Sequence, residues 1–380
     1  MHYVRLLRPP KLIRRHGGLR LQLVLAVTTD LGDALLCPEE ALDLVVRVRA
    51  YLAPYPDTTL VSYELLPATG KLQWRAGDRV VKPMLDLPPA VAEALAAAAS
   101  RKVELSVSPT EPHAADGLPT ILEASSQGGQ GKGLVMPVSV ALSGRDQSRH
   151  VCTRSLHLGP GFGYLELEED LGDSIARHVW DASPVALAAL AGACDGPCLR
   201  PLRRLLPLDG PAPVNVLELG CGVGILGAGL CALRPHCTVL MTDLDDAEDR
   251  ARANINLLGR DDLLYESLDW NDGRRGVFGP LVRSRRWDLV MLSDCTYNTD
   301  SLPALVATLS ALHHLNVEST GGFVSKAWIA TKPRHDSERV VLTLLADDGW
   351  KTVATQTLPM PVLGGEAQTV EMYLFEKSGG

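Results

Sequence analysis

A glycine-rich turn, with an acidic residue downstream of it, is the part of this sequence best suited to bind a small ligand. The run Glu218-Leu219-Gly220-Cys221-Gly222-Val223-Gly224 joins an apolar stretch, 214–219, to a segment with helical spacing. Glycines are needed where the backbone turns sharply and a ligand approaches its N–H groups closely. Asp243 ends the next apolar stretch, where a carboxylate can accept hydrogen bonds from two ribose hydroxyls. The pattern therefore predicts a site for a ligand that contains adenosine.

Two ligands of this kind compete for the site. Gly222-x-Gly224-x-x-Gly227 satisfies the dinucleotide fingerprint, although a single match of that type is weak. A pyrophosphate needs the bare helix N-terminus and no nearby carboxylate. The methionine part of S-adenosylmethionine carries an ammonium group, which tolerates a carboxylate. Glu218, placed just before the turn, therefore favours S-adenosylmethionine over a nicotinamide dinucleotide.

The elements around the turn alternate between strands and helices. Apolar runs predict strands at 214–219, 238–242, 263–268, 288–292 and 323–330, with helices near 224–233, 246–258, 301–315 and 336–347. Two further strand-like runs, 351–358 and 369–375, are joined too closely for a helical crossover and should pair antiparallel. We predict an α/β fold: a doubly wound, mostly parallel, Rossmann-like seven-stranded sheet with an antiparallel terminal strand. An additional N-terminal α+β region should precede it.

Four short elements in this order resemble a known family. They are Val179-Trp180-Asp181-Ala182-Ser183, the glycine turn, Leu268-Asp269-Trp270, and Ser293-Asp294-Cys295-Thr296-Tyr297. Together they resemble seven-β-strand, S-adenosylmethionine-dependent methyltransferases, and within these the family 16 protein-lysine methyltransferases of the Asp-x-x-Tyr type. The resemblance covers about 155–376 and leaves residues 1–150 unexplained.

The resemblance implies a set of cofactor contacts and two groups on the acceptor side. S-adenosylmethionine should be surrounded by Trp180, Glu218, Gly220, Cys221, Gly222, Gly224, Asp243, Leu244, Asp269, Trp270 and Ser293. Trp270 could stack along the adenine, and Asp269 could accept from its exocyclic amine; for the tryptophans, ordinary core packing remains the alternative. Asp294 and Tyr297 should be the catalytic residues.

The types of these two residues suit methyl transfer to a lysine. The reaction is a direct displacement on a sulfonium, so the enzyme must supply alignment and a neutral amine. The Asp294 carboxylate could capture the incoming ammonium, and the Tyr297 ring could form a wall of a narrow pocket whose burial lowers the lysine pKa. Because a carboxylate favours the charged amine, we interpret Asp294 as an orienting group rather than a general base.

The same element argues against nucleic acid as the acceptor. Enzymes that methylate base or glutamine amide nitrogens carry two prolines where this chain has Cys295 and Thr296. A formal net charge of −8 also argues against binding nucleic acid or an anionic membrane through bulk charge. We expect a lysine-bearing protein substrate, no nucleic-acid or membrane partner, and a monomer. Residues 330–336 follow the fifth strand and should shape the substrate entrance.

Composition limits the remaining classes. The chain is 46% hydrophobic and 22% charged, which excludes wholesale disorder, and no apolar run approaches the roughly 18–20 residues of a membrane span. Its eight cysteines form no Cys-x-x-Cys pair and no group with zinc spacing, so reduced thiols, no metal, and a cytoplasmic or also nuclear location are expected. Six basic residues and no acid among the first 29 residues leave a mitochondrial presequence as an alternative.

The chain should divide into three parts. Residues 1–105 form an accessory region with a strand over 19–27, a helix beginning near Pro38, and a helix over 90–99. Residues 106–149 form a flexible linker or loop, and 150–380 the methyltransferase domain. The accessory region would select the substrate or cover the catalytic domain. Two alternatives stay open for the whole chain: a nicotinamide-dependent oxidoreductase, and an inactive interaction protein that keeps the fold.

Overall fold

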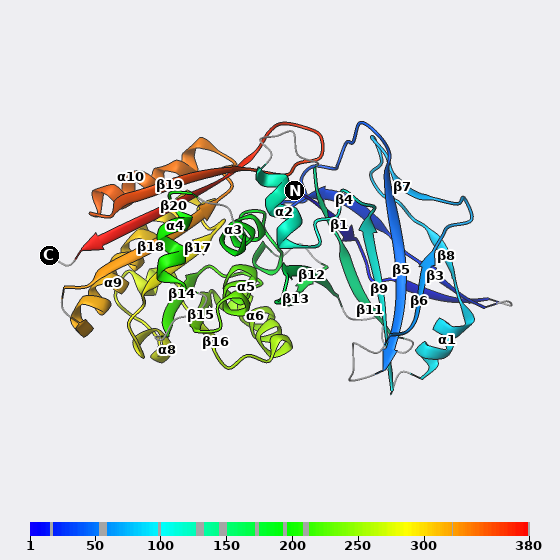
Figure 1. Cartoon of the computed structure of the whole chain (residues 1–380), viewed down its shortest axis with the longest axis horizontal. Helices are drawn as coiled ribbons and strands as arrows, with labels where there is room; N and C mark the ends of the chain where they lie inside the picture. The colour runs from blue at the N-terminus through cyan, green and yellow to red at the C-terminus, as the bar shows by residue number, and fades with distance from the viewer. Residues whose placement is uncertain are drawn as a thin grey trace.

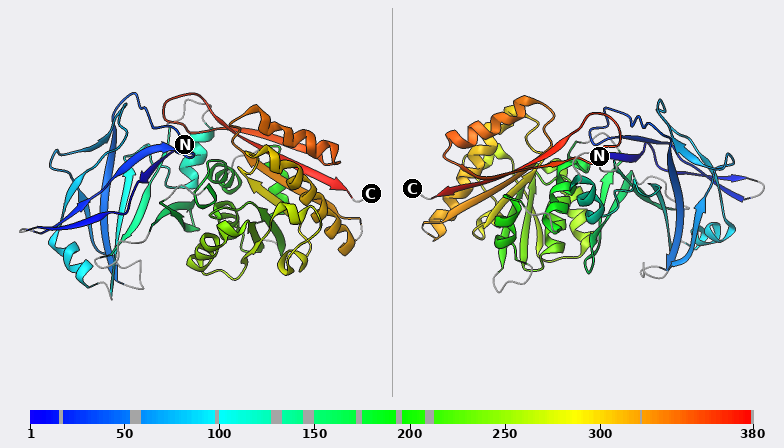
Figure 2. Two further views of the ribbon diagram at one scale, coloured as in Figure 1. Left: turned by 180° about the vertical axis from the view of Figure 1, so that it is seen from behind. Right: turned by 45° about the horizontal axis from the view of Figure 1, so that its top comes forward.

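The computed structural model describes residues 1–15, 18–52, 59–97, 100–126, 133–143, 150–171, 175–192, 196–207, 213–320 and 322–378. Two groups of sheets lie side by side along the longest axis of the molecule (Figure 1). The C-terminal sheet and its helices occupy one end, and strands from the first half of the chain occupy the other. The two further views show the same division (Figure 2).

The C-terminal part is a seven-stranded sheet with the order β16-β15-β14-β17-β18-β20-β19. Its strands are β14 (Val214–Leu219), β15 (Cys237–Asp243), β16 (Leu263–Ser267), β17 (Leu289–Ser293), β18 (Val324–Thr331), β19 (Lys351–Pro359) and β20 (Thr369–Ser378). The first five are parallel, and β20 runs antiparallel between β18 and β19. The predicted fold class is confirmed, including the antiparallel pairing of the last two strands.

Helices cover both faces of this sheet, which is why its strands are apolar on both sides. They are α3 (Ala182–Ala191), α4 (Leu199–Leu205), α5 (Ile225–Leu233), α6 (Asp245–Leu258), α9 (Leu302–Thr320) and α10 (Val340–Asp347), with the short α7 (Trp270–Gly273) and α8 (Pro280–Arg283). Successive residues of β14 enter different cores. Val216 packs in the cluster that contains α3 and α5, whereas Leu217 and Leu219 pack in the cluster that contains α9.

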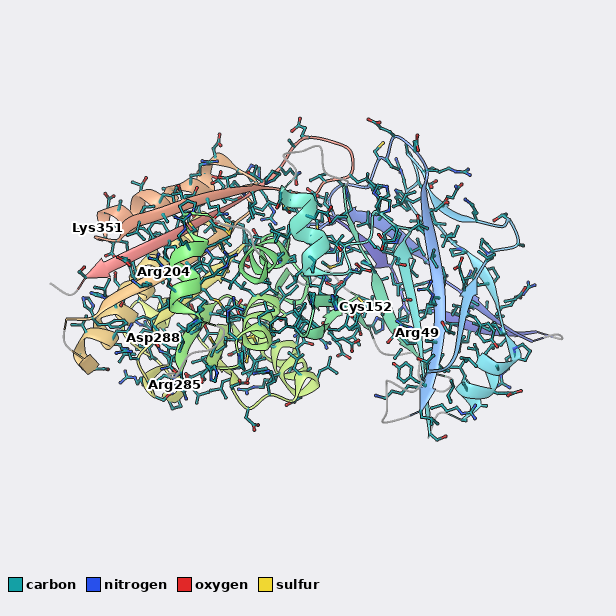
Figure 3. All side chains as sticks on the ribbon, in the orientation of Figure 1. Arg49, Cys152, Arg204, Arg285, Asp288 and Lys351 are labelled. Carbon is teal, nitrogen blue, oxygen red and sulfur yellow. The ribbon has the colours of Figure 1, made fainter. Side chains whose placement is uncertain are left out.

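The first part of the chain forms three sheets. The largest has the order β13-β12-β11-β9-β5-β6, with β7 paired to β5. These strands are β5 (Leu42–Leu52), β6 (Thr59–Leu65), β7 (Leu72–Trp74), β9 (Arg101–Pro109), β11 (Val138–Leu142), β12 (Val151–Gly159) and β13 (Gly163–Asp170). The smaller sheets are β10 (Val135–Met136), β1 (His2–Leu6) and β4 (Leu25–Thr29), and β2 (Lys11–Arg15), β3 (Gly18–Gln22) and β8 (Met84–Leu87). Figure 3 adds the side chains, with Arg49 on β5 and Cys152 on β12 labelled.

The prediction of a helix beginning near Pro38 is wrong, because the segment forms the strand β5. Its 11 residues alternate between buried and more exposed positions along most of the strand. Leu42, Leu44 and Val46 face the core while Asp43 and Arg47 do not. A period of two is typical of a strand. The acidic residues before it indicated the first turn of a helix, but the backbone forms no helix there. The predicted helix over 90–99 is confirmed as α1 (Pro89–Ala96).

The structure also differs from the predicted linker over 106–149. The described residues of that segment contribute the end of β9, helix α2 (Leu118–Ser126), β10 and β11. Residues 127–132 and 144–149, which include most of the glycine-rich run, lie outside the described residues. Strands β12 and β13 extend the N-terminal sheet to Asp170, beyond the boundary placed at 150. Serines and a threonine occupy the less buried positions of β9, β11 and β12 and weakened the sequence signal, and the neighbouring strands supply the pairing.

The first residues of the chain are built into these sheets. The strand expected over 19–27 is interrupted at 23–24 and forms β3 and β4 in different sheets. Helix α2 joins the two halves of the molecule, since Leu118 and Ile121 share a core with Leu187 of α3. No helix within the described residues is long and apolar enough to cross a membrane.

Candidate active site

A cavity of about 680 Å³ opens at the carboxyl ends of β14, β15 and β17. Eleven of the residues predicted for the site line it: Trp180, Gly220, Cys221, Gly222, Asp243, Leu244, Asp269, Trp270, Ser293, Asp294 and Tyr297. This edge is where open α/β sheets bind ligands, and the volume is that of a small-molecule site. The sheet thus brings together residues that lie more than a hundred positions apart in the sequence.

Glu218 and Gly224 are the two predicted residues that do not line the cavity. The Glu218 side chain is buried beneath the turn, and a Cβ on Gly227 would lie 2.3 Å from its Oε2. Gly224 is the N-cap of α5, with a φ of 86°. A Cβ at Gly224 would approach the Met241 sulfur at 2.7 Å. Both residues therefore shape the turn from below.

The turn itself has no room for side chains on its ligand side. Gly220 has a φ of 66°, and a Cβ there would lie 2.5 Å from the Cys295 sulfur. Cys295 is fixed in turn, because its thiol lies within hydrogen-bond distance of the carbonyl oxygens of Leu219, Gly220 and Ser293. Glycine is required at this position both for backbone conformation and for space.

Asp243 is held rigidly at the edge of the cavity. Its Oδ2 accepts a hydrogen bond from the Gly222 N–H at 2.7 Å, and its Oδ1 accepts one from the Leu244 N–H at 2.7 Å. Burial raises the pKa of Asp243 above its ordinary value, and the two amide bonds oppose that shift. Each carboxylate oxygen keeps a further lone pair. The group is therefore oriented in advance to accept from a pair of ribose hydroxyls.

Asp269 and Trp270 begin the short helix α7 rather than ending a strand. The exposed Asp269 is its N-cap, with Oδ1 accepting from the Asn271 N–H at 2.8 Å. Trp270 is half-buried against the core that contains α9 and also lines the cavity. Thr308 of α9 donates to the Trp270 carbonyl at 3.0 Å. Trp270 therefore contacts both the core and the cavity, which is compatible with stacking on the adenine and with core packing.

The Trp180 segment is held by the N-terminal sheet. Glu169 of β13 accepts from the Val179 N–H at 3.0 Å and pairs with the buried Arg154 of β12 at 2.6 Å. Arginine pairing lowers the pKa of Glu169 well below its ordinary value despite burial. On the open side, the Arg334 guanidinium lies 5.2 Å from the centre of the Trp180 ring. Trp180 is thus positioned by groups from both halves of the chain.

Asp294 lies at the cavity with its carboxylate turned into the protein. Its side chain is only 1% exposed. Oδ2 accepts from the Ala182 N–H at 2.8 Å, and Oδ1 accepts from the Lys332 N–H at 2.9 Å. Arg334 Nη1 lies 3.4 Å from Oδ1. Burial raises the pKa of Asp294, an effect that Arg334 and the two amides oppose.

The backbone of Asp294 is also unusual. Its φ of 51° makes it the only non-glycine residue with a positive φ among the described residues. This conformation costs free energy for a residue with a side chain and persists only where its surroundings hold it. The carboxylate joins the ends of β17 and β18 to the start of α3, which provides that hold. Tyr297, three residues on, is 54% exposed at the cavity mouth.

Comparison with known proteins shows what this part of the chain is similar to. Residues 163–348 match the family model described as lysine methyltransferase. The matched segment begins at β13, the strand that holds the Trp180 segment, and contains every predicted site residue. We refer to 163–348 as the methyltransferase segment.

The chain also has relatives among curated proteins. The chain is 30% identical over 191 residues to a UPF0665 family protein from Schizosaccharomyces pombe, which is 48% of this chain and 49% of the relative. It is 32% identical over 103 residues to the protein N-terminal and lysine N-methyltransferase EFM7 of Cryptococcus neoformans, which is 26% of this chain and 34% of that protein. The chain therefore spans about half or less of the length of these relatives.

Solved structures similar to this chain include methyltransferases. One is a SAM-dependent methyltransferase from Agrobacterium tumefaciens, at 14% identity and a TM-score of 0.40, covering 63% of this chain and 74% of that one. Another is the magnesium protoporphyrin IX methyltransferase of Synechocystis with bound SAH, at 16% identity and a TM-score of 0.30, covering 44% of this chain and 75% of that one.

Other residues of the methyltransferase segment line the cavity without having been predicted. They are Ala176, His178, Ser183, Val223, Ile225, Asp246, Leu268, Asn271, Cys295, Asn298, Ser301 and Ala304. Most lie within a few positions of a predicted residue, so adjacency was the available signal. Ser183 lies three positions after Trp180, and its hydroxyl forms a hydrogen bond with the Ser293 hydroxyl across the sheet edge. Only the packing of α3 against β17 places those two serines together.

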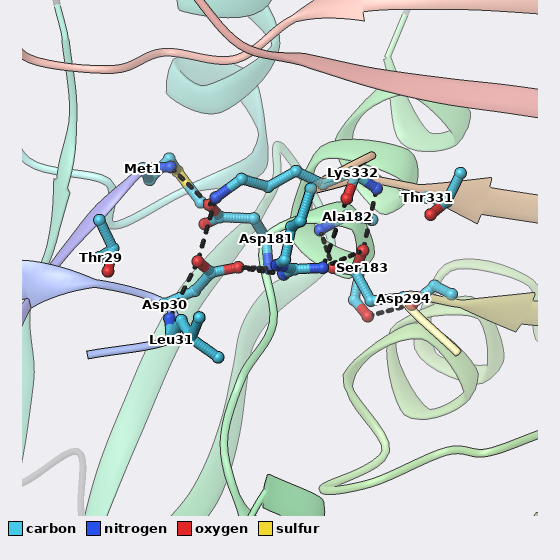
Figure 4. Close-up of polar contacts among 12 residues, drawn as sticks. Met1, Thr29, Asp30, Leu31, Asp181, Ala182, Ser183, Asp294, Thr331 and Lys332 are labelled. Carbon is cyan, nitrogen blue, oxygen red and sulfur yellow. Dashed lines mark hydrogen bonds and ion pairs between the residues drawn. The ribbon is translucent and has the colours of Figure 1, made fainter. Parts of the chain in front are cut away.

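Residues 330–336 lie at this edge as predicted, but two of their cations are largely buried. Lys332 Nζ pairs with Asp181 at 2.7 Å and with Asp30 at 3.0 Å, and Arg334 pairs with Asp30 at 2.7 Å. The α-amino group of Met1 pairs with Asp181 at 2.9 Å (Figure 4). Within the described residues, no group of three or more His, Cys, Asp or Glu side chains is arranged to hold a metal ion.

The buried Glu218 leads to a prediction about pH. Burial raises the pKa of Glu218 to about 8, although a hydrogen bond from the Gly227 backbone opposes that shift. A carboxyl whose pKa is raised in the folded state contributes stability that is fully present below its ordinary pKa and is lost as pH rises to about 8. Glu218→Gln removes this titration. We expect its melting temperature at pH 9 to exceed that of the unaltered protein by roughly 2–4 °C.

The measurement is a thermal melt of both proteins at pH 6 and pH 9. The difference between the two pH values should be smaller for Glu218→Gln. The exposed, acidic Glu318 of α9 offers a matched control, and Glu318→Gln should melt like the unaltered protein at both pH values. Equal pH dependence in all three proteins would contradict the assignment of a proton to Glu218.

Proposed function

We propose that this protein transfers a methyl group from S-adenosylmethionine to a lysine side chain of another protein. The observation that carries this is that Asp294 and Tyr297 line the same cavity as the glycine turn and Asp243. The match of the methyltransferase segment to the lysine methyltransferase family model supports the same reaction.

The cofactor side of the cavity fits the parts of S-adenosylmethionine. Asp243 would accept from the ribose hydroxyls, because its oxygens are fixed by two amides and retain free lone pairs. Leu244 and Trp270 offer apolar surfaces to the adenine. Gly220 and Gly222 line the cavity, and both have a positive φ that favours glycine over residues with a side chain. When bound, the cofactor supplies an electrophilic methyl group.

The acceptor side requires a neutral lysine amine pointing at that methyl group. The half-exposed Tyr297 ring would flank the lysine side chain and exclude water from it. A lysine taken from water into such a pocket loses part of its preference for the charged form, so its proton can pass to water before transfer. One N–C bond then forms as the S–C bond breaks.

The role proposed for Asp294 changes in the light of its contacts. A carboxylate that already accepts from two backbone amides and faces Arg334 has few lone pairs left for an incoming ammonium. We propose that it fixes the β17–β18 edge next to which the lysine enters. The capture of the lysine ammonium by Asp294 remains a prediction.

The decisive experiment uses radiolabelled S-adenosylmethionine and an extract from cells that lack this protein. We expect label in one or a few proteins, stable to base and located on lysine by mass spectrometry. Binding of S-adenosylhomocysteine and of NAD(H), each measured by calorimetry, separates the alternatives. Saturable binding of NAD(H) alone would support an oxidoreductase. Tight S-adenosylhomocysteine binding with no label in any extract would support an inactive interaction protein.

Three further expectations belong with this proposal. The acceptor is a protein rather than a nucleic acid or a membrane, in keeping with the net charge of −8. The protein acts as a monomer, which size-exclusion chromatography with light scattering checks. It works in the cytoplasm, with the nucleus as a second location, and microscopy of the tagged protein at its native expression level tests this prediction.

A further inference from the structure

Asp30 follows a strand of the N-terminal sheets, and its carboxylate lies near the active site. It follows β4, and its side chain is only 1% exposed. Its Oδ1 accepts from Lys332 Nζ at 3.0 Å, and its Oδ2 accepts from Arg334 Nη2 at 2.7 Å. Oδ2 also accepts from the Asp181 N–H at 3.3 Å. Figure 4 shows Asp30 between Lys332 and the segment that leads into α3.

Arg334 connects Asp30 to the cavity. One guanidinium nitrogen pairs with Asp30, and the other lies 3.4 Å from Asp294 Oδ1. The guanidinium also lies over the ring of Trp180. Asp294 and Trp180 both line the cavity, although their positions in the sequence differ by more than a hundred residues. A single planar cation therefore contacts two cavity residues and one residue of the N-terminal sheets.

The distances indicate what Asp30 does to Arg334. Its contact with Asp30 is the short one, and its contact with Asp294 is the long one. Arginine forms strong bidentate pairs with a carboxylate, so without Asp30 the guanidinium would be free to turn onto Asp294. Asp294 would then be drawn from the amides of Ala182 and Lys332 that hold it. The Trp180 ring would then lose its contact with the Arg334 guanidinium.

We propose that Asp30 is a positioning residue for the methyl-transfer site and that it acts through Arg334 on Asp294 and Trp180. This inference rests on the proposed function. It makes the N-terminal sheets part of the active-site framework. Selection of the substrate, the other role considered for them, would act elsewhere on their surface.

The test compares two aspartates of one loop in the full-length protein. Asp30→Asn removes the buried carboxylate, whereas Asp33→Asn changes an exposed one that bonds to Thr29 at 2.7 Å. Label transfer to the extract gives the initial rate as a function of S-adenosylmethionine concentration. Calorimetry with S-adenosylhomocysteine gives the dissociation constant and the fraction of protein able to bind.

We expect Asp30→Asn to lower the maximal transfer rate by roughly 10- to 100-fold, as for lost alignment in an active site. The dissociation constant for S-adenosylhomocysteine and the binding-competent fraction should stay within about threefold, because Asp243 and the turn are untouched. Asp33→Asn should behave like the unaltered protein. A merely structural role for Asp30 would instead lower the transfer rate and the binding-competent fraction in parallel.

The dependence of the rate on pH adds an independent readout. Asp294 faces Arg334 and Asp30, with the backbone of Lys332 and Ala182 on its other sides. The Asp30 charge raises the pKa of Asp294, and the Arg334 charge lowers it. Asp30→Asn and Arg334→Gln should therefore shift the acidic limb of the pH–rate profile in opposite directions. Loss of packing alone would not produce opposite shifts.

A second variant covers the case in which Asp30→Asn fails to fold. The double variant Asp30→Asn, Lys332→Met removes one buried carboxylate and one buried ammonium, so the net charge of the buried ion pairs is unchanged. Arg334 still loses its pairing with the Asp30 carboxylate. The double variant should show the same loss of rate. Full transfer activity in either folded variant would overturn the proposal. If the unaltered protein labels no acceptor at all, the proposed function fails instead.

Discussion

Replacing Asp294 with alanine should reduce methyl transfer by at least about 100-fold, which corresponds to roughly 2.7 kcal/mol of transition-state stabilisation. The carboxylate joins the end of β17 to the start of α3 through Ala182 and to the segment after β18 through Lys332 and Arg334, and all three contacts disappear. Binding of S-adenosylhomocysteine should change by less than about fivefold, because Asp243 and the glycine turn do not contact this carboxylate. Label transfer and calorimetry on one protein preparation provide both numbers.

Two further substitutions separate the carboxylate from the backbone conformation. Asp294→Gly removes the carboxylate but adopts the φ of 51° without strain, so it should be more stable than Asp294→Ala and equally inactive. Asp294→Asn keeps the shape yet presents an NH₂ group to a backbone N–H that needs an acceptor. Its melting temperature should fall as well. Transfer activity within threefold of the unaltered protein in any of these variants would contradict the assigned role.

Asp243→Ala should weaken the binding of S-adenosylhomocysteine by about 10- to 100-fold, equivalent to roughly 1.5–3 kcal/mol for lost hydrogen bonds to a charged group. The variant loses the acceptor for both ribose hydroxyls. It also leaves the N–H groups of Gly222 and Leu244 without their partner, which loosens the turn. Transfer at saturating cofactor should recover substantially, because the acceptor side is unchanged.

Asp249→Asn is the matched control, since Asp249 is an exposed aspartate of α6 outside the cavity. Its affinity should equal that of the unaltered protein. Equal loss of cofactor affinity in Asp243→Ala and Asp294→Ala would show that the division into a cofactor side and an acceptor side is wrong. If Asp243→Ala bound S-adenosylhomocysteine as tightly as Asp249→Asn does, only the assignment of Asp243 to the ribose hydroxyls would be wrong.

The N-terminal half changes how the site is understood. Glu168, Glu169 and Asp170 of β13 contact Arg250, Arg154 and Arg177 respectively, and Glu168 also pairs through its backbone with Asn254 of α6. One strand is therefore shared between the N-terminal sheet and the methyltransferase segment. Truncation near residue 150 would keep the β12–β13 hairpin but remove β11, the other neighbour of β12, and expose that edge of β12. The two halves are best treated as one unit in experiments.

The sequence alone determined the C-terminal sheet and most of the cavity. Alternating strands and helices with apolar cores form a parallel sheet, and parallel strands bring their carboxyl ends to one edge. The local patterns at Gly220, Asp243, Trp270 and Asp294 were therefore sufficient to place these residues together. Local signals suffice here because each residue lies at, or a few positions beyond, the carboxyl end of a strand whose direction is fixed by the fold.

Only the tertiary structure decided the orientation of Asp294 and the role of the first half of the chain. The Asp294 carboxylate turns inward because Ala182, Lys332 and Arg334 offer donors there, and these come from segments that no local pattern connects. The N-terminal strands were hard to predict because short strands with serine and threonine on one face derive their stability from neighbouring strands. Asp30 looks like an ordinary turn residue in the sequence, and becomes part of the site because a buried carboxylate must lie beside buried cations.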